Sequence, residues 1–288
     1  MEVWIGLCLA LVSALAVNWA YTKEHEAAAA MPPLSPRRPF RSLGLLLGNR
    51  SWLIGFGTES AGWLVYVAAL RLAPLSLVQA VSASGIAILA LFSVHGHPGR
   101  LALYERLAVG VALIGLVLLS LSLIGSTPSS RTPHVAGVVV WLAASAGAAA
   151  ALIVVRIRLS RTAALGLAAG LLFSDGDISA KLVSSGGIWL LALLSLVVCY
   201  AAGTSVLQTA FQHGSALTAA GIATLVTNAV PIAAGFVLFD ESLPPGARGV
   251  LQIAAFASIV ASAALLGSSA ATQPGTAKDL AEPDPRAR

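Results

Sequence analysis

The chain has 288 residues, of which 57% are hydrophobic and only 10% are charged. Soluble domains carry about 25% charged residues, so this composition is typical of a polytopic membrane protein and leaves no length for a soluble domain. The formal net charge of +5 at pH 7 is therefore expected to reflect basic cytoplasmic loops rather than nucleic-acid binding. Both cysteines, Cys8 and Cys199, fall in apolar segments, so we expect neither a disulfide framework nor a metal cluster.

Apolar segments long enough to cross a bilayer recur along the chain, which indicates the all-α class, a polytopic membrane helix bundle. We expect nine transmembrane helices, and with the N-terminus outside and the C-terminus in the cytoplasm, most of the 17 Lys and Arg residues fall in cytoplasmic segments, as the positive-inside rule requires. The predicted spans are residues 2–21, 52–71, 74–95, 104–124, 134–155, 162–182, 188–208, 215–239 and 247–267.

The two halves of the chain show the same order of spans, turns and basic loops. This predicts a first repeat at 1–124 with a basic cytoplasmic loop at 22–51, and a second repeat at 162–267. A linking helix at 134–155 separates them, and a disordered polar tail follows at 268–288. Each span of the first repeat is followed five membrane crossings later by the equivalent span of the second repeat. Because five is an odd number, the two repeats are expected to have opposite orientations in the bilayer, an architecture of many secondary transporters.

Three charged residues lie within the sixth predicted span: Asp175, Asp177 and Lys181. Each charge costs about 2.5–3.5 kcal/mol at the centre of a transmembrane helix, so this span needs partners inside a bundle and is a candidate functional site. Asp177 and Lys181 are four residues apart on one helix face and form either a structural ion pair or part of a site. Asp175 points elsewhere, and we expect it to carry the coupling proton or ion, with the other two setting its environment.

The tripeptide Asp175-Gly176-Asp177 is also a typical turn sequence. The sixth span therefore either crosses the membrane, whole or broken at Gly176, or ends in an exposed turn. Upstream, the spacing of Gly166 and Gly170 predicts a close approach to a neighbouring helix and is compatible with a homodimer.

Other polar residues at membrane depth complete the candidate set. Glu59 has no charged neighbour three or four positions away, so we expect it to face the bundle interior, water or a residue of another span. The repeat offset places Tyr200 at the equivalent position. Thr227 and Asn228 precede Pro231 in the eighth span, where they either line a cavity or make an interhelical hydrogen bond at a kink.

The segment APLSLVQAVSASGIAILALFS (73–93), its companion SALTAAGIATLVTNAVPIAAGFVLFDESL (215–243) and the layout of four, one and four spans resemble the drug/metabolite transporter superfamily (EamA-like). Within it they look most like bacterial relatives of the NIPA-type magnesium transporters. The resemblance implies an acidic residue that closes the penultimate span of each repeat, which Glu241 matches, whereas Gly96 or His97 stands at that place in the first half. Lys181 resembles a lysine that such proteins carry at the end of this helix.

These patterns favour a secondary transporter, either ion-coupled or passive, that is not an enzyme, needs no cofactor and has the lipid bilayer and a small solute or ion as partners. No G-x-x-x-x-G-K-[S/T] loop occurs, so ATP-driven pumping has no support. The expected cargo is a small polar or cationic metabolite, with Mg²⁺ or another divalent cation at Asp175, Asp177 and Glu59 as the alternative. An intramembrane aspartyl protease is disfavoured because the two aspartates face apart, and a non-transporting scaffold or receptor stays open.

Overall fold

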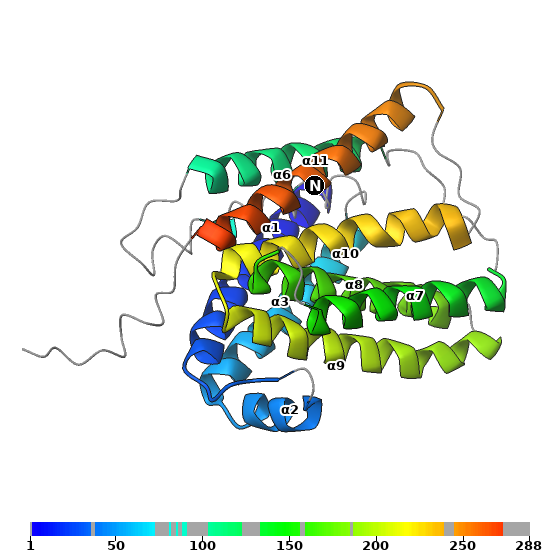
Figure 1. The fold of residues 1–288 in the computed structure, drawn as a ribbon. Coiled ribbons are helices and arrows are strands. Elements are labelled where there is room, and N and C mark those ends of the chain that lie inside the picture. Colours follow the sequence, from blue (N-terminus) through cyan, green and yellow to red (C-terminus); the bar gives the residue numbers. More distant parts are fainter. Residues whose placement is uncertain are drawn as a thin grey trace, which may run out of the picture.

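In the computed structural model, which describes residues 2–35, 38–72, 81, 85, 88–90, 103–122, 133–155, 159–184, 187–238 and 245–272, every described element is helical. The long helices form a bundle, with the short helix α2 (Pro39–Leu47) at its edge (Figure 1). In chain order they are α1 (Glu2–Ala29), α2 (Pro39–Leu47), α3 (Arg50–Leu72), α6 (Leu103–Ser122), α7 (Val135–Val154), α8 (Arg161–Ser184), the 3₁₀ helix η1 (Gly187–Leu191), α9 (Ala192–Phe211), α10 (Ala216–Leu238) and α11 (Ala247–Thr272).

Six of the described helices are long and apolar enough to cross a membrane, which confirms the polytopic helical class. They lie where the first and the fifth to ninth spans were predicted. Helices α3 and α6 lie where the second and fourth spans were predicted. Of the third predicted span, 74–95, the structure describes only residues 81, 85 and 88–90. The number nine and the repeat layout therefore stay predictions.

The first helix is longer than expected. We placed its end at residue 21, but α1 continues to Ala29, α2 follows at 39–47 and α3 begins at 50, so much of the expected loop 22–51 is helical. The reason is local: the sequence KEHEAAAA (23–30) consists mainly of strong helix formers, and the first breakers are Pro32 and Pro33. Gln212, at the turn after α9, fixes the end of this segment by two hydrogen bonds. Its Nε2 donates to Ala28 O (2.7 Å), and its Oε1 accepts from Leu34 N (2.8 Å).

Helix α8 is continuous, so the expectation of a possible break or turn at Gly176 is resolved in favour of an unbroken helix. The predicted close approach upstream is confirmed, and the neighbour is α10. A Cβ on Gly166 would lie 2.9 Å from Ala219 O, and one on Gly170 would lie 2.9 Å from Ala223 O. The absence of side chains at these two positions lets α8 and α10 pack backbone to backbone.

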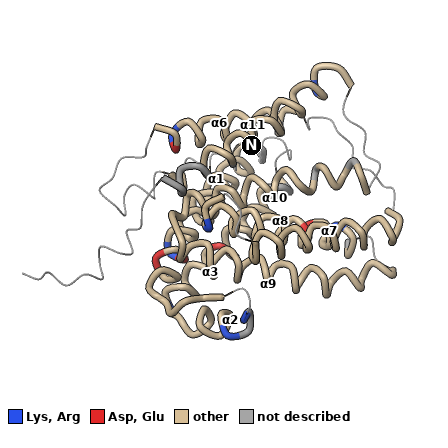
Figure 2. Tube along the Cα trace, in the orientation of Figure 1, with Lys and Arg blue, Asp and Glu red and all other residues tan. Residues whose placement is uncertain are grey.

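Three helix pairs form the most extensive contacts of the bundle: α1 with α3, α8 with α9, and α6 with α11 (Figure 1). Helix α8 also packs on α10 and α7, which makes it the most buried of the candidate spans. Figure 2 shows that the helices carry few charged residues along their length. The few acidic side chains that do lie inside the bundle are therefore the natural place to look for a site. The helix α11 extends to Thr272, and residues 273–288 of the expected tail lie outside the described residues.

Candidate functional site

Glu24 is the most deeply buried glutamate that the structure describes, with 1% of its surface exposed. It lies in the last third of α1, within a candidate membrane span. Its Oε2 accepts a hydrogen bond from Nε2 of Gln208 on α9, a residue that is itself fully buried. Glu24 Oε1 and Gln208 Oε1 have no hydrogen-bond donor among the described residues. Two acceptor oxygens are thus left unsatisfied in the same buried place, which costs free energy unless something is bound there.

The carboxylate of Glu59, on α3, lies against that of Glu24 and next to the hydroxyl of Tyr21. Gly55, one turn before Glu59, makes this approach possible, because a Cβ there would lie 2.7 Å from Cγ of Glu24 and 3.3 Å from Ala20 O. Two carboxylates in contact repel each other, so a proton or a cation must lie between them when they are in the membrane. We call Glu24, Glu59 and Gln208 the glutamate site.

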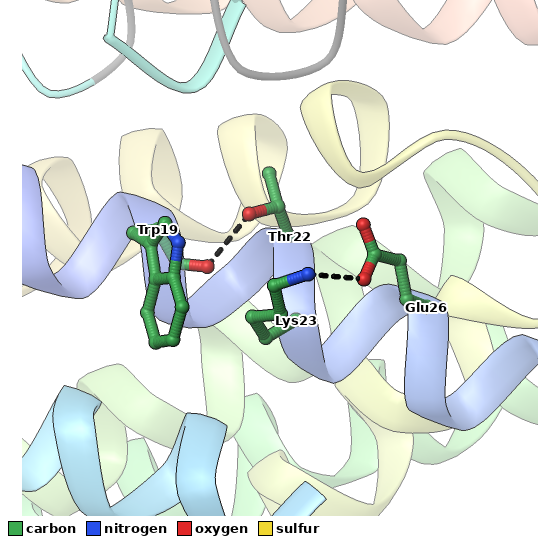
Figure 3. Close-up of polar contacts among 4 residues, drawn as sticks. All are labelled: Trp19, Thr22, Lys23 and Glu26. Carbon is green, nitrogen blue, oxygen red and sulfur yellow. Dashed lines mark hydrogen bonds and ion pairs between the residues drawn. The ribbon is translucent and has the colours of Figure 1, made fainter. Parts of the chain in front are cut away.

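The lysine beside Glu24 in sequence does not neutralise it. Lys23 Nζ forms an ion pair with Glu26 Oε2 at 2.7 Å and lies 5.9 Å from the centre of the Trp19 ring (Figure 3). Both side chains of this ion pair are well exposed. Lys23 and Glu26 thus occupy the outer side of α1, while Glu24 turns inward.

A second acidic position lies on α8. The hydroxyl of Tyr200, on α9, donates a hydrogen bond to Oδ1 of Asp177 at 2.5 Å. The ring of Tyr200 packs directly on Gly176, where a Cβ would lie 2.8 Å from two ring atoms. The glycine between the two aspartates therefore serves a close helix contact instead of a turn. Tyr200 also lies within electrostatic range of Glu59, so it connects Asp177 to the glutamate site.

Asp175 points to the other side of α8 and is fully buried. Neither of its carboxylate oxygens has a hydrogen-bond partner among the described residues, and the same holds for the hydroxyl of Ser145 on α7. Ser145 nevertheless faces the carboxylate, and Cys199 of α9 lies within electrostatic range of it. We call Asp175, Ser145 and Cys199 the Asp175 cluster.

The structure separates the residues that the sequence grouped as one site. Asp177 pairs with Tyr200 in place of the ion pair expected with Lys181, whose side chain is exposed. Thr227 and Asn228 donate hydrogen bonds to Ala223 O (2.9 Å) and Thr224 O (2.7 Å) of their own helix, so the interhelical bond suggested for this patch is not the contact observed. Glu59 faces residues of another helix, and its neighbours are Glu24 and Tyr21 of α1. Glu241 and His97 lie outside the described residues.

Sequence reasoning missed Glu24, Gln208 and Tyr21. Glu24 was assigned to a polar loop, although the run of helix formers up to Pro32 was the signal that α1 continues. Gln208 lies in an apolar helix and gave only the weak signal of a buried amide. In the part of the chain that the structure describes, no three His, Cys, Asp or Glu side chains are close enough together to form a metal cage. The glutamate site instead offers two carboxylates and an amide oxygen, the hard oxygen donors that hydrated Mg²⁺ takes in small number.

The fold and these buried acidic groups define a multi-pass helical membrane protein with the features of a transporter. Over 277 residues the chain is 25% identical to a curated protein of Arabidopsis thaliana, the probable magnesium transporter NIPA9. The matched region covers 87% of this chain and 78% of that protein. The chain matches no protein-family model, and no solved structure matches it. The similarity supports a NIPA-like transporter and points away from an enzyme.

Proposed function

We propose that the protein is a secondary transporter that moves Mg²⁺ or another divalent cation across the cell membrane by alternating access. The observation that carries this proposal is the contact between Glu24 and Glu59 beside the unsatisfied amide oxygen of Gln208. Removing two adjacent carboxylates from water is unfavourable unless positive charge accompanies them. A divalent cation with part of its water shell satisfies both carboxylates and the amide oxygen at once.

The similarity to a probable magnesium transporter favours this cargo over the polar metabolite that the sequence first suggested. The partners of the neighbouring charged residues also favour a cation at the glutamate site. Lys23 is engaged by Glu26 at the surface, and Asp177 is engaged by Tyr200. At the glutamate site two acidic groups meet, and the other side chains that act on them, Gln208 and Tyr21, are neutral.

The contact pattern also supports the inverted repeat. In the first half Glu59 of α3 meets Glu24 of α1, and in the second half Tyr200 of α9 meets Asp177 of α8. Glu59 and Tyr200 are the residues that the repeat offset places at equivalent positions. Each half therefore joins its first two helices by a polar contact, which is the arrangement expected when a midplane site forms between two related units.

Flux measurements in proteoliposomes test the proposal. Purified protein is reconstituted, and uptake is followed for Mg²⁺, Mn²⁺, Ca²⁺, small amines and amino acids, with protein-free liposomes as the baseline. We expect saturable Mg²⁺ movement that the other divalent ions inhibit. Movement of an amine or amino acid, with every divalent cation at baseline, would restore the metabolite transporter as the better assignment.

A further inference from the structure

We propose that the Asp175 cluster is a proton site, separate from the glutamate site, whose proton drives or exchanges with the transported cation. This inference rests on the proposed function for its role in transport but not for the existence of the site. It concerns a group that the cargo site does not use. The proton moves between the Asp175 carboxylate and water on one side of the membrane or the other, so only an O–H bond forms and breaks and no electrons are transferred.

Burial and the lack of partners are the first evidence. Asp175 is fully buried, and both of its oxygens lack a hydrogen-bond partner among the described residues. A carboxylate that is ionised in such a place is strongly disfavoured, while the neutral acid is tolerated. The neutral acid also has a donor that the ionised form lacks, and the unsatisfied hydroxyl of Ser145 faces it.

The charges around Asp175 give the second line of evidence. Helix α8 packs on α7, η1, α9, α10 and α11. Helices α7, η1 and α10 contain no titratable residue. Helix α9 contributes Cys199 and Tyr200, and Tyr200 is bound to Asp177. Helix α11 contributes only Arg248, which is exposed in its first turn. On α8 itself, Asp177 and Lys181 lie on other faces, and Arg161 lies at the far N-terminal end, where it donates a hydrogen bond to Ile153 O. None of these described helices therefore brings a cation to Asp175.

A proton explains this site better than a metal ion does. Metal cations such as Ca²⁺ and Mg²⁺ need about six or more oxygen ligands, from protein or water. Transporters often supply such ligands from the backbone of broken helices. Helix α8 is continuous, so its carbonyl groups accept the backbone hydrogen bonds of the helix and do not serve as ligands. Among the described residues only Asp175 and Ser145 bring oxygen atoms that have no partner here. One proton is enough to satisfy them.

The position of the cluster is suited to coupling. Cys199 and Gln208 are nine residues apart on α9, which corresponds to about 13 Å along the helix, so the two sites are distinct. Tyr200 follows Cys199 directly, donates a hydrogen bond to Asp177 and lies within electrostatic range of Glu59. A change in charge at Asp175 would alter the packing of α8 on α9, and that interface holds both Tyr200 and Gln208. The coupling therefore has a physical connection through a pair of packed helices.

Two measurements on the full-length protein test the site. The first uses dicyclohexylcarbodiimide, which modifies protonated carboxyl groups in apolar surroundings, followed by mass spectrometry of peptides. We expect labelling of Asp175 in the protein without added Mg²⁺, and no labelling of Glu26. Labelling at the glutamate site should fall when Mg²⁺ is added. Absence of the reagent from Asp175 would overturn the proton site, whatever the transport assay shows.

The second measurement follows Mg²⁺ and proton movement together in proteoliposomes with two dyes. For the wild type we expect proton flux that depends on Mg²⁺. We expect Asp175→Asn to lose this proton flux to the level of protein-free liposomes while it retains exchange of isotopically labelled Mg²⁺, and Glu26→Gln to behave as wild type. Proton flux that persists in Asp175→Asn, or Mg²⁺ flux that requires Na⁺ in place of a proton gradient, would overturn the inference.

The outcomes separate the two proposals. If the wild type moves no divalent cation but Asp175 is labelled, the proposed cargo is wrong and the proton site stands. If Mg²⁺ is transported but Asp175 is neither labelled nor needed for proton flux, the cargo stands and the proton site is wrong. If Asp175→Asn does not fold, labelling of the wild-type protein decides the question alone.

Discussion

The hydroxyl of Tyr200 on α9 donates a hydrogen bond of 2.5 Å to Asp177 on α8, across a contact that only a glycine at position 176 allows. This pair lies between the two sites described above. On one side Tyr200 lies near Glu59 of the glutamate site, and on the other its neighbour in the chain, Cys199, lies near Asp175. The interface of α8 and α9 therefore links the glutamate site to the Asp175 cluster.

Replacing Tyr200 with Phe should uncouple this interface without unfolding the protein. The variant loses one hydrogen bond and leaves a half-buried carboxylate without its donor, which costs about 1–2 kcal/mol. We expect a lower apparent melting temperature in detergent and weaker coupling of proton flux to Mg²⁺ flux. Tyr104→Phe, on α6, is the matched control and should behave as wild type. In the double variant with Asp177→Asn the two effects should not be additive; full additivity would show that the hydrogen bond carries no energy.

Replacing Gly176 with Ala tests the close contact directly. The added methyl group would lie 2.8 Å from the Tyr200 ring, and overpacking of this kind costs about 1–3 kcal/mol. We expect a clear fall in the apparent melting temperature, measured at a fixed scan rate. Gly147→Ala, on α7, provides the control, because a Cβ there meets nothing within 4 Å and alanine favours a helix. Equal melting temperatures for the two variants would show that Tyr200 does not pack on α8 as described.

Much of the fold could be predicted from the sequence because apolar length and glycine spacing are local signals. The sixth predicted span, 162–182, corresponds to α8 (Arg161–Ser184), and the pair Gly166 and Gly170 marks its crossing with α10. Helix α1 ends at Ala29 and not at residue 21 as predicted, because the polar residues that follow position 21 continue the helix. Burial of Glu24 depends on the contact of α1 with α3 at Gly55, which no local pattern shows.

The candidate site was predicted only in part, for a similar reason. Asp175 and Glu59 were selected from their cost in a membrane. Asp175 proves to be fully buried, whereas Glu59 is half-buried and lies against Glu24. The partners could not be deduced, because Tyr200 reaches Asp177 from 23 positions away in the sequence and Gln208 reaches Glu24 from 184 positions away. Helical spacing favoured Lys181 as the partner of Asp177, but packing of α9 on α8 brought a closer one.

Mg²⁺ should stabilise the wild-type protein against heat. A ligand present at 100 times its dissociation constant adds about 2.7 kcal/mol of stability. Glu24→Gln and Glu59→Gln each remove one of the two carboxylates, so we expect most of the Mg²⁺-dependent rise in melting temperature to be lost in both. Glu26→Gln, at the exposed pair with Lys23, should keep it. An equal Mg²⁺ effect in all four proteins would place the cation elsewhere.

The orientation predicted from the basic loops can be tested by labelling. Single cysteines introduced at positions 1 and 288, in a background without Cys8 and Cys199, should react with a membrane-impermeant reagent from opposite sides of the membrane. Position 1 should react from outside. Reaction of both from the same side would show an even number of spans.

We propose that Glu24 and Glu59 together hold the transported cation. The most direct measurement is the initial rate of Mg²⁺ uptake into proteoliposomes at equal protein content for the wild type, Glu24→Gln, Glu59→Gln and Glu26→Gln. We predict saturable uptake by the wild type and by Glu26→Gln, and rates at the level of protein-free liposomes for the other two variants. Wild-type uptake by both Glu24→Gln and Glu59→Gln would contradict the account.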